Sequence, residues 1–238
     1  MLGRRILLCV LPVFLSLNGC TTISTVPFRS APDSSGIGLS VKTINSMIVP
    51  VTYNADVVYF SKRCEYAESC DPTIYISSYA KDGRIYWLDV PPGEYVAVAA
   101  SFRQFADPNN YITYFPDQVI KKTTVRVEAA KFNYLGDYIL DMSLGVCPDK
   151  ADSSQLHYAE VFAPGVAKCG FLKIIGERLA STPVMFIGNQ AYAVGGGDYH
   201  YRGEIRQAGW DEGLRNDFIA RAKQDLKGKG WDPLLEQY

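Results

Sequence analysis

The 238-residue sequence predicts a mainly β protein of the α+β class, with one clear helix near its C-terminus. Sixteen tyrosines and eleven phenylalanines, together with many valines and isoleucines, favour strands. Short apolar runs recur from residue 37 to residue 205, and turn residues separate them. A fourfold apolar repeat over residues 214–226 has the period of a helix instead.

The N-terminus has the pattern of a secretory signal. Arg4 and Arg5 precede an apolar run, residues 6–17, that is well short of the ~20 residues needed to span a bilayer. Pro12 also disfavours a permanent span. A buried N-terminal helix or an uncut anchor is the alternative, and we expect residues 1–19 to be removed as a signal peptide.

The end of this segment, Leu17-Asn18-Gly19-Cys20, resembles the lipobox of bacterial lipoproteins. The resemblance implies cleavage before Cys20 and acylation of its thiol, so the lipid bilayer becomes a partner. Two or three acyl chains anchor stably, whereas one chain binds only marginally. In that family a residue other than aspartate after the cysteine, here Thr21, implies the outer membrane of the cell envelope. The side of that membrane, periplasmic or surface, stays open.

Charge excludes one class of partner. Removal of Arg4 and Arg5 leaves 22 basic and 25 acidic residues, so no basic field exists to hold nucleic acid. Residues 20–36 are rich in Ser, Thr and Pro and predict a lipidated flexible tether, with an edge strand over residues 23–28 as the alternative.

Of the six cysteines, Cys9 is lost with the signal and Cys20 takes lipid, which leaves Cys64, Cys70, Cys147 and Cys169. An even number in an oxidising compartment predicts two disulfides, for which three pairings are open. We favour Cys64–Cys70 and Cys147–Cys169, because each pair brackets a polar, loop-like stretch. No cysteines have the close spacing of a metal site, so we expect neither metal nor cofactor.

Strands are expected over residues 38–41, 47–60, 73–79, 84–90, 94–102, 111–115, 124–128 and 133–141. Lys81-Asp82-Gly83 predicts a hairpin turn. Residues 95–100 are apolar on both faces, as in a strand covered on both sides. Gly136 inside its strand predicts a bulge or a close backbone approach.

Residues 49–141 resemble a family of bacterial lipoproteins of unknown function with a transthyretin-like or carboxypeptidase-regulatory-like fold. The resemblance rests on the turn at residues 91–95 (PPGEY), an alternating strand at 125–128 (VRVE) and the strand at 134–140 (YLGDYIL). The family's E-A-G-K link is Glu128-Ala129-Ala130-Lys131 here, without the glycine. The resemblance implies an antiparallel β-sandwich over residues 37–145 and no catalytic residues.

Residues 146–238 are expected to form a disulfide-bearing extension of the same globule. It contains a polar loop at 148–155, strands at 156–162, 183–187 and 199–205, a turn at 195–198 and a helix or strand at 171–180. Asp211 caps the last helix, acids lie early and bases late in it, and Gly228 follows it. Its apolar stripe either packs on the sandwich or binds a partner or membrane.

Candidate chemistry is sparse. His157 and His200 lack a G-x-S-x-G or H-E-x-x-H setting, and Gly195-Gly196-Gly197 lacks a phosphate-loop pattern. Asp137 and Asp141 form no recognisable acid pair. The aromatic residues Tyr75, Tyr79, Tyr86, Tyr111, Tyr114 and Phe115 are either core or a surface for sugar or peptide.

We therefore expect a non-enzymatic envelope lipoprotein that acts as a binding or structural module. One alternative is an assembly factor that adds a strand to an envelope partner at an uncharged edge near residues 49–53. An envelope hydrolase is the second and disfavoured alternative.

Overall fold

The computed structural model describes residues 25–46, 50–63, 73–103, 109–169, 184–187, 190–193 and 197–238. The predicted signal peptide, Cys20, Cys64, Cys70 and residues 171–180 lie outside these ranges.

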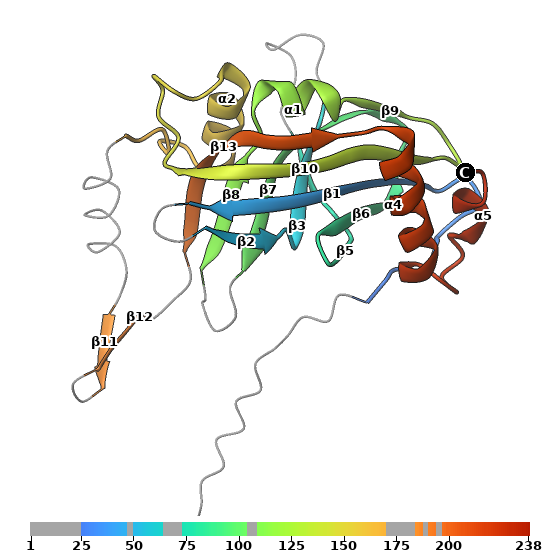
Figure 1. Cartoon of the computed structure of the whole chain (residues 1–238), viewed down its shortest axis with the longest axis horizontal. Helices are drawn as coiled ribbons and strands as arrows, with labels where there is room; N and C mark the ends of the chain where they lie inside the picture. Colours follow the sequence, from blue (N-terminus) through green and yellow to red (C-terminus); the bar gives the residue numbers. More distant parts are fainter. Residues whose placement is uncertain are drawn as a thin grey trace, which may run out of the picture.

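In the described part of the chain, eleven strands form one sheet and two more form a separate hairpin (Figure 1). The sheet contains β1 (Ser35–Asn45), β2 (Val51–Asn54), β3 (Val57–Lys62), β4 (Ile74–Ile76), β5 (Tyr79–Lys81), β6 (Arg84–Val90), β7 (Gly93–Arg103), β8 (Asn110–Tyr114), β9 (Val125–Val127), β10 (Phe132–Leu144) and β13 (Asp198–Gly209). The hairpin consists of β11 (Val184–Ile187) and β12 (Gln190–Ala193). The helices are α1 (Asp117–Lys122), α2 (Ser153–Phe162), α4 (Glu212–Asp225) and α5 (Asp232–Leu235).

The sheet is mixed. Its strand order is β4-β3-β7-β8-β13-β10-β1-β6-β5, with β2 added to β1 and β9 added to β7. β1 runs parallel to β10, and β13 runs parallel to β8. The prediction of a wholly antiparallel sheet is therefore wrong, because strands far apart in sequence become neighbours. The predicted boundary after residue 145 divides this sheet, since β13 lies between β8 and β10.

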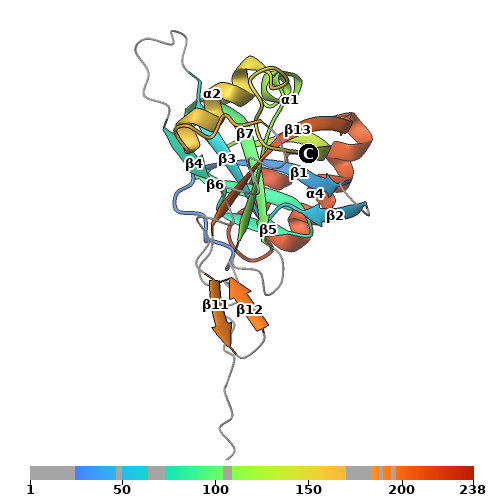
Figure 2. The same ribbon diagram turned by 90° about the vertical axis from the view of Figure 1, so that its left-hand side faces the viewer.

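The sheet curls until its two ends meet in one short segment (Figure 2). Ser77 and Ser78 are consecutive, yet they hydrogen-bond to opposite ends of the strand order. The Ser77 amide donates to the Val58 carbonyl of β3 at 3.0 Å, and the Ser78 amide donates to the Tyr86 carbonyl of β6 at 2.8 Å. Residues 74–81 thus connect the β3 side to the β6 side, and the concave face encloses a core.

The main core follows from strand alternation. Ile37, Leu39 and Val41 are fully buried on the same face of β1. Across the core, Trp87 packs on Tyr75 and Tyr95, with ring centroids 5.1 Å and 4.9 Å away. This aromatic packing fills the interior, so three of the chain's large rings stabilise the fold.

Several sequence predictions are confirmed. Asp82 and Gly83 have φ of +51° and +79° and form the two-residue turn between β5 and β6. β7 is buried along eight consecutive residues, Tyr95–Phe102. The Leu135–Gly136 pair lies at a register shift between β1 and β10, and Gly136 has φ +109°. A Cβ at Gly136 would lie 2.8 Å from the Gly209 carbonyl oxygen, so the bulge requires glycine.

The predicted strand over residues 156–162 is wrong, because this segment belongs to α2. Asp152 and Gln155 form a capping box that starts the helix, so the predicted loop at residues 148–155 also ends early. Gln155 is 2 % exposed, and its amide donates to the Tyr114 and Gly203 carbonyls at 3.1 and 2.6 Å. These bonds hold α2 against the outer face of β8 and β13.

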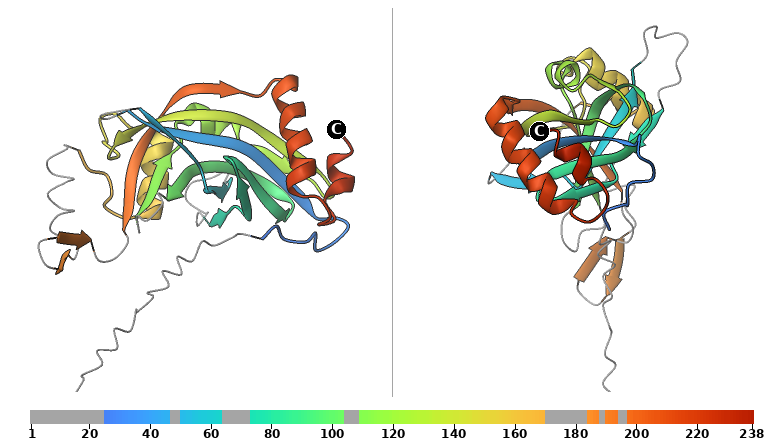
Figure 3. Two further views of the ribbon diagram at one scale, coloured as in Figure 1. Left: turned by 60° about the horizontal axis from the view of Figure 1, so that its bottom comes forward. Right: turned by 90° about the vertical axis from the view of Figure 1, so that its right-hand side faces the viewer.

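At the opposite end of the sheet, α4 and α5 pack together (Figure 3). The Asp211 carboxylate caps α4 by accepting from the Leu214 amide at 3.0 Å. Phe218 of α4 is buried against Phe132 and Tyr86. A Cβ added at Gly38 would lie 2.5 Å from a Phe218 ring carbon, so this glycine of β1 makes room for the helix.

The described part of the predicted tether, residues 25–36, packs on the domain instead of forming a flexible linker. The indole of buried Trp231 donates to the Pro27 carbonyl at 3.0 Å, and the Arg29 amide donates to the Lys229 carbonyl at 2.9 Å. Val26 packs against the same cluster as α4 and α5. Tertiary contacts with the C-terminus thus override a composition that is typical of linkers.

Candidate functional site

A row of stacked aromatic rings lies on three neighbouring strands. Phe102 of β7 faces Tyr111 of β8 across the sheet, and Tyr111 faces Tyr199 of β13. Both pairs of ring centroids are 5.1 Å apart, with interplanar angles of 11° and 15°. Because directly opposite residues project from the same face, strand register alone creates this row.

A fourth ring contacts this row from a strand on the other side of the curled sheet. Tyr53 of β2 stacks on Phe102 with centroids 4.3 Å apart and planes 9° apart. β2 pairs with β1, which is not a neighbour of β7 in the strand order. The stack therefore lies on the concave face, and we call Tyr53, Phe102, Tyr111 and Tyr199 the aromatic row.

Two threonine hydroxyls share this face. Thr43 lies opposite Tyr53 in the β1–β2 ladder, and Thr113 follows Tyr111 by two residues in β8, so each side chain points to the concave side. Both residues are 0 % exposed. Their Oγ1 atoms have no hydrogen-bond partner within the described residues.

A buried hydroxyl without a hydrogen-bond partner lowers the stability of the folded state. A hydroxyl that folding leaves without a partner costs roughly 1–3 kcal/mol, and such groups are uncommon in folded proteins. Thr43 and Thr113 are therefore candidates for hydrogen bonds to a bound molecule. The flanking aromatic row supplies apolar contact area, which is the usual composition of a small-molecule site.

A second candidate is a polar pocket of about 450 Å³ between α1, α2 and β13. It is lined by Pro116, Gln118, Lys150, Asp152, Gln155, Arg202, Gly203, Glu204 and Ile205. Three of its charged side chains, those of Arg202, Glu204 and Asp152, are engaged: Arg202 donates to the Lys150 carbonyl at 3.0 Å and pairs with Glu204. Asp152 accepts from the Asp117 amide at 2.9 Å. These bonds brace the helices against the sheet.

The predicted cysteine pair nearest this region is described. Cys147 and Cys169 form a disulfide, with Cα atoms 4.9 Å apart. The Asp149 carboxylate lies 3.4 Å from the Cys169 sulfur. Cys20, Cys64 and Cys70 lie outside the described residues, so lipidation and the other disulfide stay predictions.

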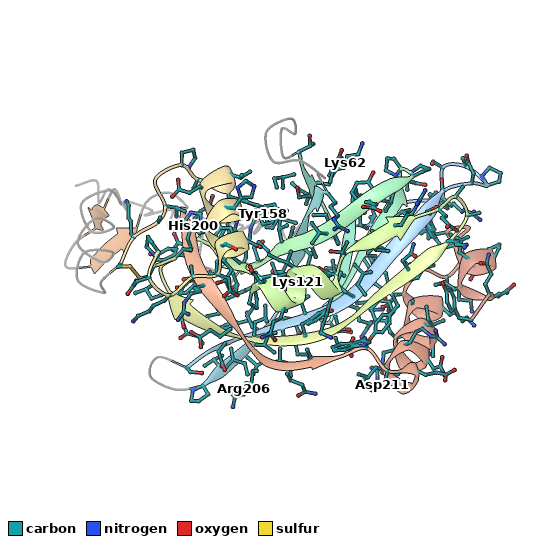
Figure 4. The ribbon with its side chains drawn as sticks, turned by 90° about the horizontal axis from the view of Figure 1, so that it is seen from above. Lys62, Lys121, Tyr158, His200, Arg206 and Asp211 are labelled. Atoms are coloured by element: carbon teal, nitrogen blue, oxygen red, sulfur yellow. A yellow bond between two sulfur atoms is a disulfide. The ribbon has the colours of Figure 1, made fainter. Side chains whose placement is uncertain are left out.

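The two histidines belong to different elements, His200 to β13 and His157 to α2, and Figure 4 shows His200 at the end of the molecule where α2 lies. The His200 ring stacks on Tyr114, and its Nδ1 is 2.8 Å from the Tyr114 hydroxyl. Burial raises the pKa of that tyrosine. His157 is exposed on α2 and contacts the ring of Tyr158.

The acids singled out in the sequence bind nearby side chains. Asp137 accepts from the Tyr134 hydroxyl at 2.8 Å, and Asp141 pairs with Arg206 at 3.2 Å. These contacts connect neighbouring parts of the fold, and Asp141 also lies opposite Glu204 in the β10–β13 ladder.

Of the six aromatics proposed as core or surface, only Tyr111 belongs to the aromatic row. Tyr86, Tyr114 and Phe115 are fully buried, Tyr75 packs into the main core, and Tyr79 stacks on Tyr86. Sequence reasoning missed Tyr53, Phe102 and Tyr199. The sequence pattern places these residues near strand ends, but it does not give the pairing register that aligns their rings across the sheet.

The strongest ionic cluster lies at the other end of the molecule. The Asp225 side chain is 3 % exposed and accepts from Arg84 at 2.7 Å, Tyr86 at 2.8 Å and Lys81 at 3.0 Å. Burial alone would raise the pKa of Asp225, but the three hydrogen bonds outweigh it, and the pKa falls below 3.8. The cluster joins α4 to the β5–β6 hairpin.

Comparisons with known proteins identify no relative: no family model, curated protein or solved structure matches the chain. Within the described ranges, no helix has the length and apolar character required to cross a membrane.

Proposed function

We propose that this protein is a lipoprotein of the cell envelope, held in the outer membrane by acylated Cys20, whose domain binds a small ligand at the aromatic row. The signal-like start and the lipobox resemblance support the anchor. The observation that carries the binding role is the aromatic row together with two buried, unpartnered hydroxyls on one concave face.

The chemistry of this face suits an amphipathic ligand. Stacked rings offer apolar edges, and hydroxyl groups both donate and accept hydrogen bonds. A saccharide or a short peptide combines apolar surface with such groups. The envelope-module role needs no catalytic step. His200 contacts the Tyr114 hydroxyl and His157 contacts the ring of Tyr158.

Removal of a single hydroxyl tests the binding role. The probes are N-acetylglucosamine oligomers and a panel of short peptides, measured by calorimetry on the full chain. Thr43→Val and Thr113→Val should each weaken binding about tenfold, the equivalent of one hydrogen bond of about 1.4 kcal/mol. Thr124→Val is the matched control, because that hydroxyl bonds to the Ile120 carbonyl at 3.0 Å elsewhere.

Stability measurements separate binding from folding. A valine at Thr43 or Thr113 removes an unsatisfied group, so the variants should be as stable as the wild type or more stable. Thr124→Val loses an existing bond and should be destabilised. Binding that is unchanged in both test variants would contradict the proposal.

A specific observation favours the assembly-factor alternative. β2 is a four-residue strand (Val51–Asn54) without charged side chains, and Val51 is 42 % exposed. Since β2 pairs only with β1 among the described strands, its other edge can accept a strand. Val51→Lys places a charge at this exposed edge position and should abolish partner capture in this case, while the β2 backbone that carries Tyr53 stays paired with β1.

The transthyretin-like relationship also stays a proposal. The turn before β7 and the antiparallel β3–β7 and β7–β8 pairs support it. The parallel β1–β10 and β8–β13 pairs depart from the expected sandwich.

A further inference from the structure

The short distance between the lipidation site and the folded domain restricts how the domain can sit on a membrane. Four residues lie between Cys20 and Thr25, the first described residue, so five Cα–Cα steps join the two. A fully extended chain of this length spans at most about 18 Å. The acylated cysteine therefore stays close to whatever surface surrounds residues 25–30.

That surface is fixed to the domain. The bonds from Trp231 to the Pro27 carbonyl and from the Arg29 amide to the Lys229 carbonyl hold both sides of Phe28. The first described residues therefore belong to the same body as α4 and α5 (Figure 3).

The chemistry of this surface suits a lipid headgroup layer. Phe28 is 66 % exposed, the largest exposure among the described large hydrophobics. The Lys229 ammonium lies 4.0 Å from the centroid of its ring, and Lys227 is exposed in the same loop. An apolar ring beside lysines is the pattern of a membrane-interface contact, where the ring enters the acyl boundary and each lysine is attracted to anionic lipid.

We infer that Phe28, Lys227 and Lys229 form a membrane-contact face that seats the domain on an anionic phospholipid surface; this inference rests on the proposed Cys20 anchor. It orients the molecule, because the aromatic row lies near the start of β13 and α4 follows the end of that strand. The start of β13, which carries Tyr199, then lies at the end of the sheet away from the bilayer (Figure 1).

The test uses the acylated full chain in vesicles of 70 % phosphatidylcholine and 30 % phosphatidylglycerol. A polarity-sensitive fluorophore is attached to Phe28→Cys, and the control carries it at Ile76→Cys, a 58 % exposed site on β4. The fluorophore at position 28 should shift to the blue and be quenched by spin-labelled lipid, whereas the fluorophore at position 76 should do neither. Lys227→Glu with Lys229→Glu should reduce the position-28 signal by at least half in these vesicles.

The outcomes separate the face from the anchor. Equal solvent exposure of the two fluorophores on vesicle-bound, palmitate-labelled protein would overturn the membrane-contact face and leave the anchor intact. Palmitate labelling that persists in Cys20→Ala would overturn the anchor, and with it the inference.

Discussion

Asp225 of α4 and Arg84 of β6 form a buried ion pair between residues 141 positions apart in sequence. The guanidinium donates from Nε at 2.7 Å and from a second nitrogen at 3.3 Å, so both carboxylate oxygens are engaged. Tyr86 and Lys81 complete the carboxylate's partners. One side chain thus attaches α4 to the β5–β6 hairpin.

Replacement of this carboxylate should destabilise the domain. Asp225→Asn removes the buried counter-charge of Arg84, whose side chain is 11 % exposed and keeps only the exposed Asp82 carboxylate at 3.2 Å. A broken buried pair costs about 3 kcal/mol or more. Urea unfolding measures the loss. Asp217→Asn removes an exposed pair with Arg221 and should cost less than about 0.5 kcal/mol; equal effects of the two substitutions would refute the assignment.

The same pair predicts a pH dependence. The folded-state pKa of Asp225 is lower than its ordinary value of 3.8. Its contribution is therefore complete above 3.8 and is lost as the pH falls through the folded-state pKa. The stability gap between wild type and Asp225→Asn should narrow between pH 5 and pH 2. A constant gap in denaturant titrations across this range would contradict the prediction.

The contact between β1 and α4 requires glycine at position 38, because a larger residue would meet the Phe218 ring. Gly38→Ala places a Cβ against the Phe218 ring and should cost about 1–3 kcal/mol through overpacking. The double variant Gly38→Ala/Phe218→Leu should recover part of this loss relative to the sum of the single changes. Gly197→Ala is the control, because its nearest neighbour atom lies 4.0 Å away. Strict additivity would show that the two sites do not touch.

Reduction of the Cys147–Cys169 disulfide should destabilise the protein. The bond closes a loop with a sequence separation of 22, which corresponds to about 3 kcal/mol in the chain-entropy model. The shorter predicted Cys64–Cys70 loop gives about 2 kcal/mol. Non-reducing peptide mapping checks both pairings, and Cys147→Ala/Cys169→Ala measures the larger effect. Four free thiols in the oxidised protein would rule out both bonds.

Local signals were sufficient where neighbours in sequence determine the structure. The Asp82-Gly83 turn, the doubly buried β7 and the bulge at Gly136 each follow from two or three adjacent residues. The prediction of a strand over residues 156–162 was wrong, although the sequence contains a helix signal at this segment. Asp152 and Gln155 have capping-box spacing, and Gln155, Tyr158, Ala159 and Phe162 share one helical face.

Long-range pairing could not be predicted from patterns. Nothing in β13 specifies that it enters between β8 and β10, yet this insertion aligns Tyr199 with Tyr111. Likewise, the Ser- and Pro-rich residues before β1 are typical of a linker, and only the folded position of Trp231 gives them a partner. The candidate site therefore depends on strand register, which the sequence pattern does not specify. The hydroxyls of Thr43 and Thr113 become candidate ligand contacts only because folding buries them without a partner.

The position of β1 also determines how the domain would respond to tension. β1 is the strand nearest to Cys20 in the chain, and it is bonded on both sides, to β10 and to β6. A pull on a membrane-held Cys20 would act along the axis of β1, after the contacts of residues 27–29 have opened. The two ladders would then be loaded in shear, so many hydrogen bonds would share the force at once. If Cys20 holds the protein to a membrane as proposed, this arrangement resists mechanical unfolding better than one in which the anchor leads into an edge strand.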